Sequence, residues 1–512
     1  MWINFLWALI PILWLIISLG IIGMSASRAC TIGLIITITD AVLMFKQPLI
    51  NTLSGALEGI IMGIWPIMYV ILAALFVYQI TTESGSMQTI ETLLSSITTD
   101  KRILVLIIAW GFGGFLESIA GFGTAVAICA GILISLGLEP IQASVICLVA
   151  NSTATAFGAI GLPVLTLAEV TNLNEVQLGF IVTLQLVILV ILVPFILVIL
   201  TGKSVRALKG IVFITLMSGV GMAIPQVIIA KFTGAELPAL VGSLFSILIT
   251  VWLTKRKTGA VEEVENESIS EIIKACSPFI LVFVFVLLAS SLCPPVNNFL
   301  TSVTTHLHVY LGKNPNDLPI NWLSSLGTLI LLAGLIGGKI QGLSFNKMFK
   351  ILVNVLKTIG MTTVTVCAIV GLAKVMVYAG MTNALALALV SLLGPAYPLF
   401  APLIGALGTF LTGSATSANV LFGNLQYSAA QSLGVSKYWI VASNMTGATA
   451  GMLSPQNIAV ATGAINKEGL EGKILKETVK WGSLYLLITC VFLYLVGFLT
   501  SLGLRTFLFI GI

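Results

Sequence analysis

Charged residues are scarce in this sequence: only 8% of its 512 residues are Asp, Glu, Lys or Arg, whereas soluble globular proteins carry about 25%. Hydrophobic residues make up 58%. This composition excludes a soluble enzyme and a secreted domain. Because a helix needs about 20 apolar residues to cross a bilayer, the chain is long enough for about 12 spanning helices. The sequence therefore predicts an all-α polytopic membrane protein.

Motifs for catalysis and for metal or cofactor binding are also missing. The sequence contains no HExxH, no GxSxG and no P-loop. Its only histidines, His306 and His308, have no cysteine near them, and the seven cysteines occur singly without CxxC spacing. The net charge of +5 comes mostly from short loops, where basic residues orient a membrane protein. We therefore expect no enzyme activity, no cofactor, no metal site and no nucleic-acid partner.

Basic residues predict the orientation of the spans. They gather in alternate loops, so the positive-inside rule places these loops in the cytoplasm and both termini outside the cell. The longest polar stretch, 256–275, then becomes a cytoplasmic linker between two halves, 1–255 and 276–512. The basic residues of the cytoplasmic loops are Arg28, Lys101, Arg102, Lys203, Arg206, Lys209, Lys255, Arg256, Lys257, Lys347, Lys350, Lys467, Lys473, Lys476 and Lys480.

The two halves resemble each other weakly. Gly85 aligns with Gly380 and Phe115 with Phe410, and in each half a cluster of small and polar residues follows. The aligned apolar runs 57–80 and 351–378 cross the membrane in opposite directions in this topology. We therefore expect two inverted-topology repeats, a construction common among secondary transporters.

Polar interruptions break the apolar pattern twice in each half. Glycine disfavours a helix interior by about 1 kcal/mol, and non-helical backbone at bilayer depth is tolerated only against protein or water. We predict re-entrant hairpins at 103–138 and 397–433, with turns near Gly121, Gly123 and Gly413. Unwound crossing helices are predicted at 141–163 and 437–462.

These interruptions are the candidate substrate site. None of the five arginines lies in them, but free N–H groups at half-helix N-termini can hold an anion without a cationic side chain. The alternative is that these small and polar residues only pack helices together. The candidate substrate-binding residues are Ser118, Gly121, Gly123, Thr124, Asn151, Ser152, Thr153, Thr412, Ser414, Thr416, Ser417, Asn419, Asn444, Thr446, Ser454 and Gln456.

Four charged residues fall within predicted spans: Asp40, Glu58, Glu117 and Lys374. Charges inside a membrane are functional candidates because they are costly there. Glu117 lies at the first hairpin turn, where a buried carboxyl can carry a proton at neutral pH; the alternative is that it caps the next helix. We expect structural roles for Asp40 and Glu58, and expect Lys374 to reach toward the membrane surface.

Four sequence blocks resemble the bacterial lactate permease family: WGFGGFLESIAGFGTAVAI (110–128), CLVANSTATAFGAIGLPV (147–164), GTFLTGSATSANVLFGNLQ (408–426) and SPQNIAVA (454–461). The resemblance implies transport of L-lactate, D-lactate or glycolate, typically with protons. It also implies that the substrate and coupling site is lined by Glu117, Asn151, Ser414, Thr416, Ser417, Asn419, Ser454 and Gln456.

The sequence departs from that family's pattern at two positions. Ala415 stands where the family usually has Asp, and Gly451 where it usually has Lys. Removing both partners of a buried ion pair destabilises a protein less than removing only one, because no buried charge is left unpaired. Our hypothesis is that Glu117 is the sole titratable group at the site and that one proton moves with each substrate.

The sequence thus predicts a proton-coupled symporter for a small 2-hydroxy monocarboxylate in the plasma membrane. The resemblance to the lactate permease family implies L-lactate as the favoured substrate, with D-lactate and glycolate as further candidates. Two alternatives stay open: a sodium-coupled carboxylate transporter, because Ser, Thr and Asn also coordinate Na⁺, and a substrate-gated channel.

Overall fold

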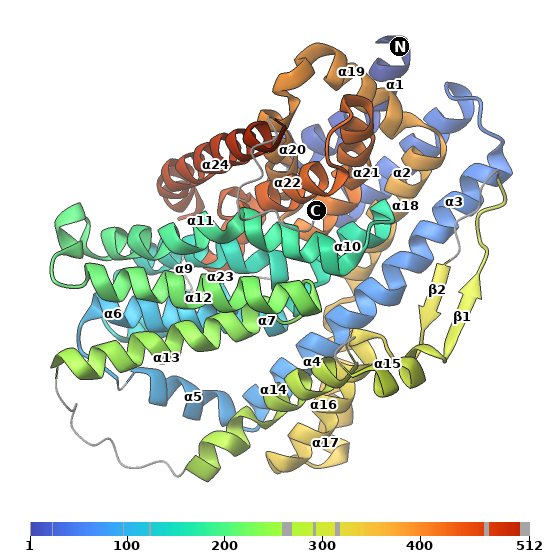
Figure 1. Ribbon diagram of the computed structural model, residues 1–512. Coiled ribbons are helices and arrows are strands. Elements are labelled where there is room, and N and C mark those ends of the chain that lie inside the picture. Colours follow the sequence, from blue (N-terminus) through green and yellow to red (C-terminus); the bar gives the residue numbers. More distant parts are fainter. Residues whose placement is uncertain are drawn as a thin grey trace.

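A computed structural model of the chain describes residues 2–22, 24–95, 97–121, 124–258, 269–289, 293–312, 318–464 and 470–501. Within these ranges, 11 helices are long and apolar enough to cross a membrane. Figure 1 shows that nearly the whole molecule is helical, which confirms the predicted fold class.

The helices of the first half are α1 (Trp2–Leu15), α2 (Ala26–Leu43), α3 (Leu49–Met62), α4 (Tyr69–Glu83), α5 (Ser86–Ser95), α6 (Lys101–Val105), α7 (Gly113–Ala120), α8 (Thr124–Ser135), α9 (Pro140–Ala154), α10 (Gly158–Thr171), α11 (Glu175–Gly202), α12 (Val212–Thr233) and α13 (Pro238–Thr258). Those of the second half are α14 (Ile269–Ala289), α15 (Pro294–Thr301), α16 (Leu326–Ile340), α17 (Phe345–Thr358), α18 (Gly360–Tyr378), α19 (Met381–Leu393), α20 (Tyr397–Thr412), α21 (Ala415–Leu433), α22 (Lys437–Ala448), α23 (Pro455–Ala464) and α24 (Glu471–Ser501).

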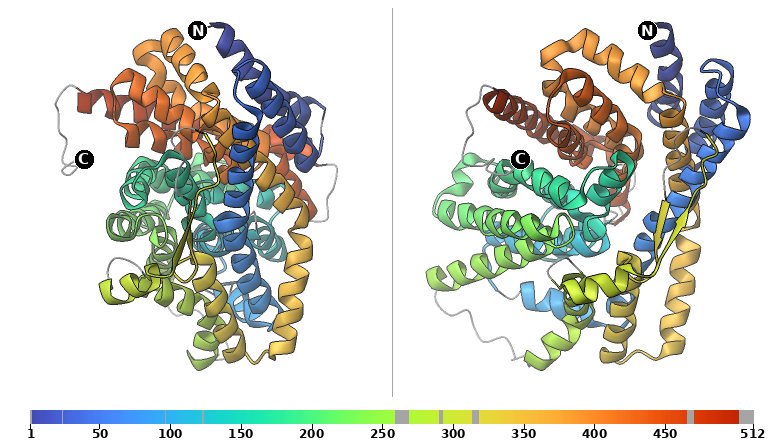
Figure 2. Two further views of the ribbon diagram at one scale, coloured as in Figure 1. Left: turned by 90° about the vertical axis from the view of Figure 1, so that its right-hand side faces the viewer. Right: turned by 45° about the vertical axis from the view of Figure 1, so that its right-hand side comes forward.

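The helices form two groups, which lie side by side in Figure 2. The scaffold group comprises α1–α5 and α14–α19, in which α18 packs on α2 and α3, and α16 packs on α4 and α14. The hairpin group comprises α6–α13 and α20–α24, in which α12 packs on α11 and α13, and α20 packs on α22. Each group therefore contains helices from both halves of the sequence.

Small residues allow the close helix contacts within the scaffold group. A Cβ atom on Gly59 of α3 would lie 2.6 Å from the Cα atom of Gly371 on α18. Such a distance means that the two backbones are in contact. Close contacts of this kind stabilise helix pairs in membranes by van der Waals packing, because the hydrophobic effect does not act between helices in lipid. Any larger residue at position 59 would force α3 and α18 apart.

The secondary structure differs from expectation in two places. The apolar run 351–378 is not one helix: it falls on the amphipathic helix α17 and on α18, with the division at Ile359. Residues 294–320, which lie outside the predicted interruptions and the linker, contain α15 and part of an antiparallel hairpin of β1 (Thr304–Leu307) and β2 (Leu318–Asn321). Amino-acid composition indicates neither the division of 351–378 into two helices nor the strand hairpin.

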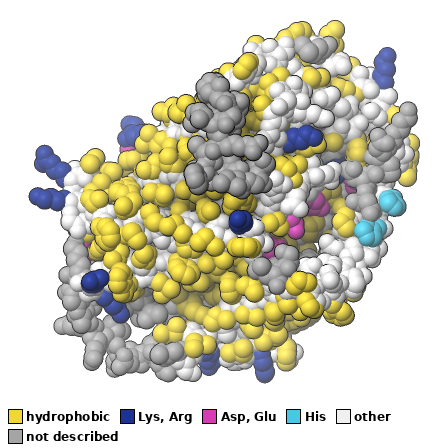
Figure 3. All heavy atoms as spheres, viewed as in Figure 1, with side chains coloured by type: hydrophobic (Ala, Val, Ile, Leu, Met, Phe, Trp, Pro, Cys, Tyr) yellow, Lys and Arg dark blue, Asp and Glu magenta, His cyan; other side chains and the backbone are white. Residues whose placement is uncertain are grey.

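The molecular surface suits a lipid environment. Apolar side chains cover much of the face in Figure 3, and many of the Lys and Arg side chains lie toward its edges. Exposed Leu, Ile, Val and Phe occur along most of the long helices, including α3, α12, α13 and α24. Because a soluble protein does not expose such an area, we read this surface as facing lipid.

Candidate functional site

Both predicted turns interrupt their helices at a glycine. The first helix, α7, ends where Gly121 has φ +63°, and the second, α20, ends where Gly413 has φ +67°. Glycine adopts these backbone angles without steric cost. A Cβ atom on Gly413 would also overlap the side chain of Gln456, so a larger residue there would displace Gln456. Whether the two helical hairpins are re-entrant in the membrane stays a prediction.

The second hairpin turn is held by its own hydroxyl groups. The Oγ1 atom of Thr412 donates to the carbonyl oxygen of Ser414 at 3.1 Å and accepts from the Ser414 N–H at 3.2 Å. Ser414 is the N-cap of α21, and its Oγ atom accepts from the Ser417 N–H at 3.2 Å. This arrangement fixes the N-terminus of a 19-residue helix.

The first crossing helix breaks where the sequence predicts it. After α9, a short 3₁₀ turn (Thr155–Phe157) leads into three left-handed residues, Ala159, Ile160 and Gly161. Positive φ in Ala and especially in the β-branched Ile is unfavourable and persists only where the surroundings enforce it.

The second crossing helix has a corresponding break. The helix α22 ends at Ala448, a 3₁₀ turn (Gly451–Leu453) follows, and α23 begins at Pro455. The Oγ atom of Ser454 accepts from the Gln456 N–H at 3.3 Å, and Asn457 Nδ2 donates to the Gly451 carbonyl at 2.9 Å. The helix ends at both breaks, between α9 and α10 and between α22 and α23, therefore lie in the same region of the protein.

Glu117 lies beside the first break. It is buried, with 3% of its surface exposed, and a Cβ atom on Gly158 would lie 3.0 Å from its Oε1 atom. Gly158 thus leaves room for the carboxyl group to contact the unwound backbone. The Gly121 N–H donates to the Glu117 carbonyl at 2.9 Å, so the same residue also closes α7.

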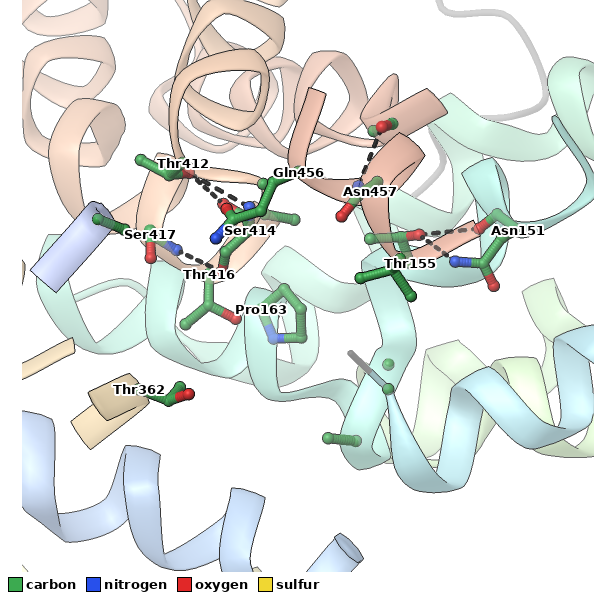
Figure 4. Close-up of a pocket in the computed structure, with 18 of the residues that line it drawn as sticks. Asn151, Thr155, Pro163, Thr362, Thr412, Ser414, Thr416, Ser417, Gln456 and Asn457 are labelled. Atoms are coloured by element: carbon green, nitrogen blue, oxygen red, sulfur yellow. Dashed lines mark hydrogen bonds between the residues drawn. The ribbon is translucent and has the colours of Figure 1, made fainter. Parts of the chain in front are cut away.

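A cavity of about 580 Å³ collects these elements, which Figure 4 shows in close-up. Its walls come from both hairpin turns, both helix breaks, the start of α2 and the start of α18. The cavity therefore lies between the hairpin group and the scaffold group. Among the described residues that line it, Glu117 is the only charged one, and none is Lys or Arg.

The structure brings nine of the candidate residues to the cavity wall and leaves others behind it. The lining residues are Glu117, Gly121, Asn151, Ser152, Thr412, Ser414, Thr416, Ser417 and Gln456. The residues that do not line it are Ser118, Thr153, Asn419, Asn444, Thr446 and Ser454, all of them buried. Gly123 falls outside the described residues, and only the backbone of Thr124 is described.

Asn419 and Asn444 belong to a buried hydrogen-bond network behind the cavity. Asn444 Nδ2 donates to Asn419 Oδ1 at 2.9 Å, and Asn419 Nδ2 donates to the Pro163 carbonyl at 2.8 Å. Gln426 Nε2 donates to Asn444 Oδ1 at 3.2 Å, and the Tyr397 hydroxyl donates to Gln426 Oε1 at 2.8 Å. The network ties the unwound part of α10 to α20, α21 and α22.

Asn151 differs from Asn444, its counterpart in the other half, because it borders the cavity. Its Nδ2 atom donates to Thr155 Oγ1 at 3.3 Å. Its Oδ1 atom is shielded from solvent, and no donor within the described part of the chain satisfies it. A buried acceptor without a donor is costly, so a ligand hydroxyl or a cation would stabilise this position.

Sequence reasoning missed the scaffold side of the cavity. Ser25 and Ser27 at the start of α2, and Thr362 and Thr365 at the start of α18, also line it. Figure 4 shows Thr362 across open space from Thr416 and Pro163. These residues lie in ordinary spanning helices, so only their tertiary position marks them.

Lys374 does not extend to the membrane surface, which corrects the expectation for this residue. Its ammonium group lies 3.0 Å from the Glu58 carboxylate, and the Tyr378 hydroxyl donates to the same carboxylate at 2.7 Å. Glu58 and Lys374 therefore join α3 to α18 inside the scaffold group.

The fold and the cavity define a multi-pass membrane transporter. The chain belongs to the L-lactate permease family, whose model matches residues 4–500. An L-lactate permease of Streptococcus iniae is 53% identical, over 85% of this chain and 92% of that protein. Glycolate permease GlcA of Escherichia coli is 34% identical, over 98% of this chain and 96% of that protein.

Among solved structures, the chain is similar to the efflux pump MtrF of Neisseria gonorrhoeae. It has a TM-score of 0.48 and 16% identity, over 87% of this chain and 83% of that one.

Proposed function

We propose that this protein is a proton-coupled symporter that carries a small 2-hydroxy monocarboxylate, foremost L-lactate, across the plasma membrane. The relatives named L-lactate permease and glycolate permease support this substrate class, because lactate and glycolate are both 2-hydroxy acids. The observation that carries the proposal is the polar cavity between the two helix groups, with one buried carboxyl group in its wall.

The substrate carboxylate is held by helix N-termini rather than by a cationic side chain. The helices α21 and α23 begin at the cavity, and the Thr416, Ser417 and Gln456 side chains lie beside these ends. Free N–H groups and the helix dipole together favour an anion there. The Asn151 side chain borders the cavity, and its amide oxygen turns toward the substrate and accepts from the substrate hydroxyl.

Glu117 carries the coupled proton. Its carboxyl group is buried in the cavity wall, beside the space that the substrate would occupy. Protonation of Glu117 before the substrate enters removes repulsion between two negative groups. The loaded site then moves as the hairpin group shifts against the scaffold group, which opens the cavity to alternate sides.

Sodium coupling is the second candidate, favoured by the same Asn151 Oδ1 atom, since an unpaired amide oxygen is also a ligand for Na⁺. The deciding experiment is uptake of labelled L-lactate into sodium-free proteoliposomes with an alkaline interior. Accumulation that disappears when an ionophore collapses the pH gradient supports proton symport. Uptake only after sodium is added supports the second candidate, and downhill flux without accumulation would indicate a channel.

A further inference from the structure

The helix α17 has three distinct faces, and one of them is buried against the rest of the protein. Outside this face, the Phe345 ring lies 5.5 Å from the Lys339 ammonium group. Met348, Ile351 and Val355 are buried against neighbouring helices. At about 100° per residue, these three side chains lie within about 60° of arc. They pack toward α4, α16 and α18, so α17 is fixed to the scaffold group along this face.

The second face is apolar and exposed. Phe345, Phe349 and Leu356 are 63%, 66% and 48% exposed, and they lie within about 40° of arc next to the buried face. Large exposed aromatic side chains in a row are unfavourable against water. This face therefore requires an apolar environment other than the chain itself.

The third face is basic. Lys350 and Lys357 are exposed and lie about 100° further round the helix than the phenylalanines. The helix has no acidic residue, and its remaining lysine, Lys347, pairs with Glu83 at 3.2 Å. An apolar face adjoining a basic face is typical of helices that lie in the membrane surface.

We propose that α17 lies in the membrane–water interface and binds the anionic headgroups of bilayer lipids through Lys350 and Lys357. The two phenylalanines enter the acyl region, and the lysines stand at headgroup level. A second copy of the chain suits this surface less well, because two such faces would bring like charges together. The position of α17 also matters for transport, since its single-residue link to α18 leads directly to the cavity residue Thr362.

Lipid retention tests the charge part of the proposal. The purified full-length chain is titrated with phosphatidylglycerol or phosphatidylcholine, and bound lipids are counted by native mass spectrometry. We expect the parent chain to retain phosphatidylglycerol preferentially. In the variant Lys350→Gln/Lys357→Gln, this retention should weaken about fivefold for each lysine removed at low ionic strength. The control Lys203→Gln/Lys209→Gln removes the same charge from an exposed loop and should retain phosphatidylglycerol. Equal retention by the two variants, or no preference between the lipids, overturns the proposal.

Depth in the bilayer tests the apolar part. A fluorophore is attached to Phe349→Cys or, as the matched control on the opposite face, to Asn354→Cys, with the signal of the labelled parent chain subtracted. Brominated lipids should quench the label at position 349 several-fold more than the label at 354. Similar quenching of the labels at both sites contradicts the proposal. Weak quenching at 349 together with a doubled particle mass also contradicts it, because this result would show that a second copy of the chain covers this face.

Discussion

The Lys374 ammonium lies 3.0 Å from the Glu58 carboxylate, with 11% and 1% of the two side chains exposed. A buried ion pair stabilises little by itself, but removing one partner leaves a buried charge uncompensated, at a cost of about 3–5 kcal/mol. We expect Lys374→Met to lower the melting temperature in detergent strongly and Glu58→Gln/Lys374→Met to recover most of the loss. Strictly additive effects of the two substitutions would show that the pair is not coupled.

Glu117→Gln tests the coupling group without changing its size. The variant should lose accumulation of L-lactate driven by a pH gradient, because the amide cannot release a proton. It should retain exchange of labelled for unlabelled L-lactate across the membrane, because the cavity keeps its shape. Glu139→Gln, which alters an exposed carboxylate paired with Lys203, serves as the control and should accumulate normally. Accumulation by Glu117→Gln at the parent level would rule out this proton path.

Gly413→Ala tests the second hairpin turn. Gly413 and Gly380 both have positive φ, which costs an alanine about 1 kcal/mol. Only at Gly413 would the added Cβ atom also meet Gln456, whereas nothing lies within 4 Å of a Cβ atom at Gly380. We therefore expect Gly413→Ala to reduce the uptake rate at least tenfold and Gly380→Ala to reduce it little. If both variants transport equally well, the turn tolerates rearrangement and Gln456 is not held by it.

Asn151→Ala and Asn444→Ala should have different effects although the predicted repeat aligns the two residues. Asn151→Ala should raise the KM for L-lactate about tenfold with little change in melting temperature, because its side chain borders the cavity. Asn444→Ala should reduce stability by about 1–3 kcal/mol, because it leaves Asn419 Oδ1 without its donor and removes one acceptor of Gln426 Nε2. Uptake kinetics and thermal unfolding of both variants separate the two roles. The assignment fails if Asn151→Ala unfolds like Asn444→Ala.

The sequence was sufficient to predict the helical fold and the helix breaks that surround the cavity, but not the division between α17 and α18 at Ile359. Glycine, asparagine and proline act locally, so the interruptions near Gly121, Asn151, Gly413 and Pro455 could be located without tertiary information. The inverted relation of the halves, their boundaries and the orientation of the termini remain predictions.

The scaffold wall of the cavity could not be predicted in this way. Ser25 and Thr362 lie far apart in the sequence, and each is a common polar residue near a helix start. Only the packing of α2 against α18 brings them to one cavity. The pairing of Lys374 with Glu58 across α3 and α18 is invisible to a local pattern for the same reason.

The absence of Lys and Arg from the described cavity wall affects how long a substrate stays bound. A salt bridge in a dry pocket would give tight binding and slow release, and each tenfold gain in affinity requires about 1.4 kcal/mol. Dipoles and neutral donors hold an anion more loosely, and in the proposed transport cycle the hydroxyl groups from α2 and α18 would remain behind when the hairpin group moves. Such a site binds its substrate weakly and releases it quickly: we expect a dissociation constant well above the micromolar range and a short residence time at each membrane face.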